Sequence, residues 1–148
     1  MWKQTYQRDR LPYNELSHLY SAFGQYDKSV EEAREALRLE PNTAANYSNL
    51  AQYYLSLNRL DEARAVLKKA QERKLESRDL LWIGYQLAFV EGDKREMKWL
   101  VEQAVGKAGI EDLLLGLKAD TEAYHGTQRP IHKALATVSR TPRQKNWG

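Results

Sequence analysis

The sequence predicts an all-α protein built from about four helix–turn–helix repeats, and three regularities support this prediction. Turn-forming residues recur every 34 positions, at Gly24, Asn58, Gly92 and Gly126. Twelve positions after each comes a small or short apolar residue: Ala36, Ala70, Ala104 and Val138. Eleven positions before each stands a large apolar residue: Tyr13, Tyr47, Leu81 and Leu115. A phase kept through four passes without an insertion indicates repeated structural units.

The first hairpin is expected at residues 11–23 and 26–40. Apolar residues spaced by three and four, such as Tyr13, Leu16 and Tyr20, predict its first helix. Pro12 stands early in that helix, where a missing N–H costs little. The second helix follows Gly24 and has its own apolar stripe, which includes Val30 and Ala33.

The second hairpin is expected at residues 43–57 and 60–74. Pro41 breaks the chain before it, and Thr43 is a suitable N-cap for the next helix. By the same phase, the remaining helices are expected at residues 77–91, 94–107, 111–125 and 129–140. No window alternates with period two, so no strand is predicted.

The two repeated columns have physical reasons. A small residue at positions such as Ala36 and Ala70 lets the two helices of a hairpin cross closely. Glycine or asparagine in the turn tolerates the positive φ that such a connection requires. One hairpin cannot bury its apolar face alone, so neighbouring hairpins are expected to stack and create the core together.

Composition limits the classes of function. The chain of 148 residues has no cysteine, so it has no disulfide framework, zinc ribbon or thiol nucleophile. It contains no run of about 18 apolar residues and no signal-peptide core, which predicts a soluble protein without membrane insertion. A cytoplasmic location is favoured over the extracytoplasmic part of a membrane-anchored parent.

The charge pattern argues against a nucleic-acid partner. The net charge of +3 comes from Arg140, Arg143 and Lys145, because the rest of the chain has as many acidic as basic residues. A nucleic-acid-binding domain usually carries its basic face on the folded body.

Sequence patterns of catalysis are missing too, so we expect no enzyme, no cofactor and no metal. His18, His125 and His132 do not have metal-ligand spacing. There is no glycine-rich phosphate loop, and no serine stands in a nucleophile elbow.

The repeat at residues 44–77 resembles the tetratricopeptide repeat family most clearly, through Tyr47, Leu50, Ala51, Tyr54 and the residues of the second stripe. The resemblance implies a right-handed α–α superhelix with repeats at 10–43, 44–77, 78–111 and 112–138. Residues 1–9 would be the remnant of a preceding helix, and 139–148 a basic tail.

The later repeats depart from the family pattern. In the third repeat, Gly84 stands where leucine is usual, and Tyr85 stands where a small residue is usual. The fourth is the weakest match, with Lys118, Glu122 and Ile131 in columns that are normally apolar or small.

Several short segments look like the C-terminal repeat regions of acidobacterial Ser/Thr protein kinases and of winged-helix regulators. They include Gly24-Gln25-Tyr26, Glu35-Ala36-Leu37-Arg38-Leu39, Asn46-Tyr47-Ser48-Asn49-Leu50 and Glu111-Asp112-Leu113-Leu114. This resemblance implies a part of a larger bacterial signalling protein, as a scaffold or sensor. The alternative is a complete small protein with frayed ends.

In the family, the first helix of each hairpin lines a concave groove. Taken with the helical register, this gives ten candidate groove residues: Asn14, His18, Asn49, Gln52, Ser56, Trp82, Gln86, Phe89, Asp120 and Tyr124. Polar groups would bind a peptide backbone and aromatic ones its apolar side chains. The alternative for Trp82 and Phe89 is packing against the neighbouring repeat.

The predicted function is therefore a non-catalytic module that binds a protein or peptide in this groove. The alternative is self-association, as a homodimer, through uncapped repeat ends. A chaperone-type carboxylate clamp is rejected. Asn49 matches its middle asparagine, but Asn14, Asp79 and Ile83 stand in its cationic columns.

Overall fold

The computed structural model describes residues 11–106 together with Gly116 and Ala119, and it confirms the all-α repeat fold. Six helices follow one another: α2 (Leu11–Ala22), α3 (Tyr26–Leu39), α4 (Ala44–Ser56), α5 (Leu60–Glu72), α6 (Arg78–Glu91) and α7 (Lys94–Ala104). Within the described residues there is no strand. The six expected helices from residue 11 to 107 are confirmed to within a few residues. The two expected helices beyond them lie almost entirely outside the described residues.

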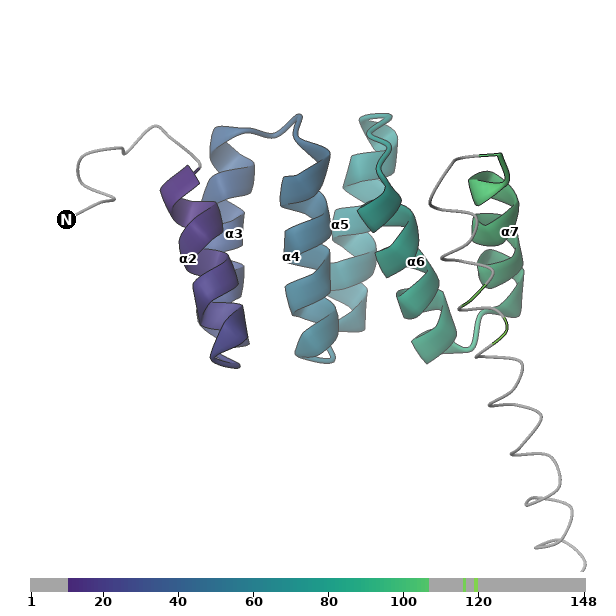
Figure 1. Cartoon of the computed structure of the whole chain (residues 1–148), viewed down its shortest axis with the longest axis horizontal. Helices are drawn as coiled ribbons and strands as arrows, with labels where there is room; N and C mark the ends of the chain where they lie inside the picture. The colour runs from purple at the N-terminus through teal and green to yellow at the C-terminus, as the bar shows by residue number, and fades with distance from the viewer. Residues whose placement is uncertain (1–10, 107–115, 117–118, 120–148) are drawn as a thin grey trace, which may run out of the picture. The chain divides into compact units, whose positions relative to one another are not determined.

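The chain divides into two compact units, residues 1–105 and 106–148, and all six helices belong to the first. Successive helices pair as α2 with α3, α4 with α5 and α6 with α7 (Figure 1). Helix α4 also packs against α3 and α6, and α5 packs against α6, so the middle hairpin contacts both of its neighbours. Figure 1 shows α2, α4 and α6 succeeding one another along one side of this unit.

The turn prediction is confirmed at each of the three hairpins in the described range. Gly24, Asn58 and Gly92 have φ values of 70°, 56° and 73°. In each turn, the next residue donates its N–H to a carbonyl five positions back, as Arg59 does to Tyr54 at 2.9 Å. This is the Schellman ending of a helix, which needs a left-handed residue at its centre.

The same motif ends α5, at a position where no sequence signal predicts it. Lys74 has a φ of 56°, and Leu75 donates its N–H to the Ala70 carbonyl at 3.0 Å. A lysine in the left-handed region is unfavourable by about 1–2 kcal/mol relative to glycine. The turn between the second and third hairpins therefore has the same backbone geometry without the glycine or asparagine that would predict it from the sequence.

Thr43 stands at the N-cap position of α4, as expected, but its side chain does not cap the helix. Thr43 has the extended backbone of an N-cap, yet its hydroxyl donates to Glu40 Oε2 at 3.1 Å instead of accepting from α4. Side-chain caps form at the next hairpin. Ser77 Oγ accepts from the Leu80 N–H at 3.1 Å, and Asp93 Oδ1 accepts from two N–H groups at the start of α7.

The small column lies in the core, as predicted: Ala36, Ala70 and Ala104 are completely or almost completely buried. Ala70 belongs to the central cluster, which joins α3 to α6 and whose larger members are Val30, Tyr47, Leu50, Tyr53, Tyr54, Val66, Ile83 and Leu87. Because its residues come from consecutive hairpins, the core is shared between the hairpins and does not lie within any one of them.

Both departures of the third repeat are buried in the structure. Tyr85 is only 1% exposed, at a position where the family pattern usually has a small residue. Gly84 lies against α7, since a Cβ built there would lie 3.5 Å from Leu100 Cδ1, which is ordinary contact distance.

Two glycine-to-alanine substitutions should change stability in opposite directions. Gly84→Ala places a methyl group at ordinary contact distance from Leu100 inside a helix, so we expect about 1 kcal/mol of added stability. Gly92→Ala forces alanine into the left-handed region and should cost about 1–2 kcal/mol. Urea unfolding of both variants measures this, and a loss of stability in Gly84→Ala would refute the packing described around Leu100.

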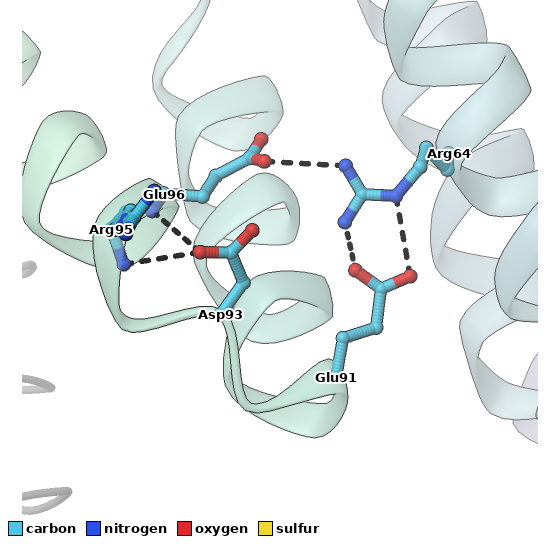
Figure 2. A network of polar contacts seen from close by, with 5 residues as sticks. All are labelled: Arg64, Glu91, Asp93, Arg95 and Glu96. Carbon is cyan, nitrogen blue, oxygen red and sulfur yellow. Dashed lines mark hydrogen bonds and ion pairs between the residues drawn. The ribbon is translucent and has the colours of Figure 1, made fainter.

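An ion-pair network connects the second hairpin to the third (Figure 2). Arg64 on α5 holds both carboxylate oxygens of Glu91 at the end of α6, and its NH1 donates to Glu96 Oε2 at 3.2 Å. The geometry is that of a bidentate fork with a third, bridging bond. Since these groups are partly exposed, the network contributes about 1 kcal/mol or less, and it fixes how the two hairpins are oriented.

Candidate functional site

The predicted groove residues lie on α2, α4 and α6, the first helices of the three described hairpins. His18 and Ser56 are exposed, and Asn49, Gln52, Trp82, Gln86 and Phe89 are half-buried. His18, Gln52 and Gln86 occupy one column at steps of 34 residues. Asp120 and Tyr124 lie outside the described residues.

A chain of hydrogen bonds joins α2 to α4 at the centre of this face. Tyr53 OH lies 3.2 Å from His18 Nδ1 and 3.3 Å from Ser17 Oγ. His18 Nε2 lies 3.3 Å from Asn49 Nδ2. Among the predicted residues, the structure therefore brings His18 and Asn49 into contact.

The directions of these bonds follow from the number of protons available. Ser17 spends its only hydroxyl proton on the Asn14 carbonyl at 2.8 Å, so Tyr53 must donate to Ser17. Tyr53 then accepts from a proton on His18 Nδ1, and the neutral ring leaves Nε2 to accept from Asn49.

The network orients the Asn49 amide and leaves part of it available. One of its two N–H groups is used by His18. Within the described residues, no hydrogen bond engages Asn49 Oδ1. A fixed amide with one acceptor and one spare donor is suited to the two polar groups of a peptide unit.

Ser17 does not have the environment of a nucleophile. It is fully buried, and its hydroxyl bonds to the carbonyl one turn earlier in α2. A catalytic serine must reach its substrate and donate its proton to a base. The Ser17–Tyr53–His18 chain therefore joins two helices, whereas the exposed part of the site is the His18 ring and the Asn49 amide.

Asn14 lies deeper than a groove residue should. It is only 7% exposed, and its Nδ2 donates to Asn46 Oδ1 at 3.3 Å. Its amide thus connects α2 to the first turn of α4, and little of it remains for a ligand. We therefore place Asn14 behind the groove surface.

The α6 part of the face is more apolar and more tightly packed. Trp82 packs against the central core cluster, which is the alternative that the sequence left open, and it remains partly exposed. The Gln86 Oε1 atom is buried and has no hydrogen-bond partner within the described range. Such an oxygen costs about 1–3 kcal/mol, which rotation of the amide toward a donor would recover.

Tyr53 was missed by sequence reasoning, although a signal for it existed. The contacts across α2 and α4 join residues 31, 32, 35 and 36 positions apart. These separations are one repeat of 34 shifted back or forward by less than one helical turn. Adding one repeat to His18 and then stepping along α4 would have indicated both Asn49 and Tyr53.

Burial raises the pKa of the Tyr53 hydroxyl above its usual value of 10.0, and its hydrogen bonding with the Ser17 and Ser21 side chains lowers the pKa by less. The folded chain thus keeps this proton at a pH where the unfolded chain has lost it. Stability from this group is complete below pH 10 and declines as the pH rises through the folded pKa. We expect Tyr53→Phe to lose less stability between pH 9 and 11 than wild type, measured by urea unfolding. Parallel profiles for the two proteins would contradict this.

The described residues form neither a metal site nor a membrane-spanning helix. No group of three or more His, Cys, Asp and Glu side chains there is arranged to hold a metal ion. No described helix combines the length and apolar character needed to cross a bilayer.

Part of the repeat region is similar to a known protein family. The family model described as tetratricopeptide repeat matches residues 20–81, from the end of α2 to the start of α6. No curated protein shows a significant match to the chain. Tetratricopeptide repeats generally mediate protein–protein interactions and are generally non-catalytic. The match therefore supports a likeness to the tetratricopeptide repeat family over residues 20–81.

Proposed function

We propose that this chain is a non-catalytic module that binds a peptide or protein segment along the face of α2, α4 and α6, the concave groove of the expected superhelix. One observation carries the proposal. An exposed imidazole, His18, bonds to a half-buried amide, Asn49, and the other nitrogen of the ring bonds to Tyr53, which is itself 4% exposed. A pre-organised polar pair at the surface lowers the entropy lost on binding.

The rest of the face extends this pair into a strip. Gln52 and Ser56 continue along α4, and Gln86 stands on α6 in the same column as His18. The partly exposed rings of Trp82 and Phe89 supply apolar area. Polar groups would then bind the backbone of an extended segment, and the rings would take its apolar side chains.

A larger parent protein gives this module its setting in our proposal. The segments that look like acidobacterial kinases and winged-helix regulators favour a scaffold or sensor part of a bacterial signalling protein. One type of repeat fold can bind many different partners, so the proposal of a larger parent protein rests on this resemblance alone.

Affinity capture from a lysate of the source organism tests the groove. The groove variant is Asn49→Ala/Gln52→Ala, and the matched control is Gln71→Ala/Gln103→Ala, which changes two exposed amides on α5 and α7. All three proteins should show the same helical circular dichroism. A partner retained by wild type and control but lost by the groove variant supports the proposal. Equal retention by all three would contradict it.

Self-association is the second candidate, and one surface favours it. Leu11 and Leu19 on α2, and Phe23 directly after its end, are 50%, 51% and 71% exposed. Exposed apolar stripes of this kind often mark interfaces. Light scattering over a concentration series decides: a strict monomer removes this candidate. A dimer abolished by Leu19→Glu/Phe23→Glu supports it.

A further inference from the structure

A surface hollow lies between the ends of α3 and α5, beside the start of α4, and none of the candidate groove residues lines it. Its volume is about 450 Å³. Leu37, Pro41 and Tyr47 provide its apolar part, and the Tyr47 hydroxyl donates to the Pro41 carbonyl at 2.8 Å. This bond ties the α3–α4 turn to α4 and fixes one wall of the hollow.

Four basic side chains surround the hollow: Arg34, Arg38, Lys69 and Arg73. Arg34 Nε donates to the Tyr54 hydroxyl at 2.8 Å, and Arg73 NH1 donates to Asn42 Oδ1 at 2.8 Å. Both acceptors are uncharged. Within residues 11–106, no carboxylate lies at ion-pair distance from Arg34, Lys69 or Arg73.

Acidic groups offset only part of this charge. Arg38 pairs with Glu35 at 2.9 Å, and Glu72 also lines the hollow. The C-terminal ends of two helices add about half a negative charge each. Three cations without an ion-pair partner therefore face one carboxylate and two helix ends, which leaves the hollow positive.

The guanidinium groups also retain bonding capacity. Each has five N–H donors in a planar fork that matches a carboxylate. Arg34 holds a neutral phenol through Nε, which orients the group without neutralising it. Cations held by neutral partners keep their charge available for a ligand.

We infer that this hollow is a second binding site, which takes an acidic peptide segment carrying an apolar side chain between its carboxylates. The positive rim supplies charge-assisted hydrogen bonds to the carboxylates. The apolar wall of Leu37, Pro41 and Tyr47 takes the apolar side chain. This inference does not rest on the proposed groove, because none of the groove residues lines the hollow.

The test uses the full chain and a labelled peptide, acetyl-Glu-Asp-Leu-Glu-Glu-amide, in fluorescence anisotropy titrations. The site variant is Lys69→Gln/Arg73→Gln, and the control is Lys68→Gln/Lys94→Gln, which removes the same charge from exposed positions outside the hollow. We expect affinity to fall about tenfold or more in the site variant and less than about twofold in the control. Raising the salt concentration should weaken binding of wild type.

Several results would overturn the inference. They are equal binding of the neutral analogue acetyl-Gln-Asn-Leu-Gln-Gln-amide, equal losses in site and control variants, and no saturable binding at millimolar peptide. Tighter binding of a short single-stranded RNA that is lost in the site variant would assign the hollow to nucleic acid instead. The Asn49→Ala/Gln52→Ala groove variant should bind the acidic peptide like wild type, so the outcomes for the two surfaces remain distinguishable.

Discussion

Asn46→Ala is expected to lower the free energy of unfolding by about 3 kcal/mol. Asn46 is completely buried, and its Nδ2 donates to the carbonyls of Ala36 at 3.1 Å and Glu40 at 2.9 Å. Its Oδ1 accepts from Asn14 Nδ2 at 3.3 Å. One side chain thus joins the end of α3 to α4 and to α2. Alanine would leave the two carbonyls and the amide donor without this hydrogen-bond partner, and it would also leave a cavity.

The matched control is Asn49→Ala, one turn further along α4. Asn49 is half-buried and bonds only to the His18 ring among the described residues, so we expect a loss below about 1 kcal/mol. Urea unfolding of both variants at neutral pH gives the two free energies. Equal losses would mean that Asn46 does not hold three helices together. Because Asn46 positions α2 on α4, its loss should also weaken the contact of His18 with Tyr53.

Periodicity made the helical part of this structure predictable. The 34-residue phase placed the bounds of six helices, the left-handed turns and the buried alanines at Ala36, Ala70 and Ala104. Each of these features depends on contacts within one hairpin or on the local backbone. The left-handed conformation of Lys74 was not predicted, because its turn joins two hairpins and contains no glycine or asparagine at that position.

The candidate site was less predictable because it forms between hairpins. The register indicated His18 and Asn49 separately, but their contact depends on how far α2 is shifted along α4. That shift also buried Asn14 and brought Tyr53 into the network. The basic hollow has the same origin, since Arg34 and Lys69 come from different hairpins and share no column of the repeat. A pattern of basic residues on helix surfaces does not show which of them meet.

Ala70→Trp is expected to cost about 3 kcal/mol or more of unfolding free energy. Ala70 is 1% exposed on α5 and belongs to the central cluster, where Tyr47, Tyr54 and Val66 are also buried. Overpacking a dense core by a few methylenes typically costs about 1–3 kcal/mol, and an indole adds far more volume than that. The last turn of α5 would have to move, and Leu75 N, which donates to the Ala70 carbonyl at 3.0 Å, would move with it.

Ala65→Trp provides the control for this substitution, since Ala65 is exposed on the same helix. The same change in volume and helix propensity there should alter stability by less than about 0.5 kcal/mol. Thermal and urea unfolding of the two variants separate the effect of the buried column from that of tryptophan itself. A stable, wild-type-like Ala70→Trp protein would show that the hairpin helices do not cross closely at this column. In that case the recurring alanines would need an explanation other than close helix packing.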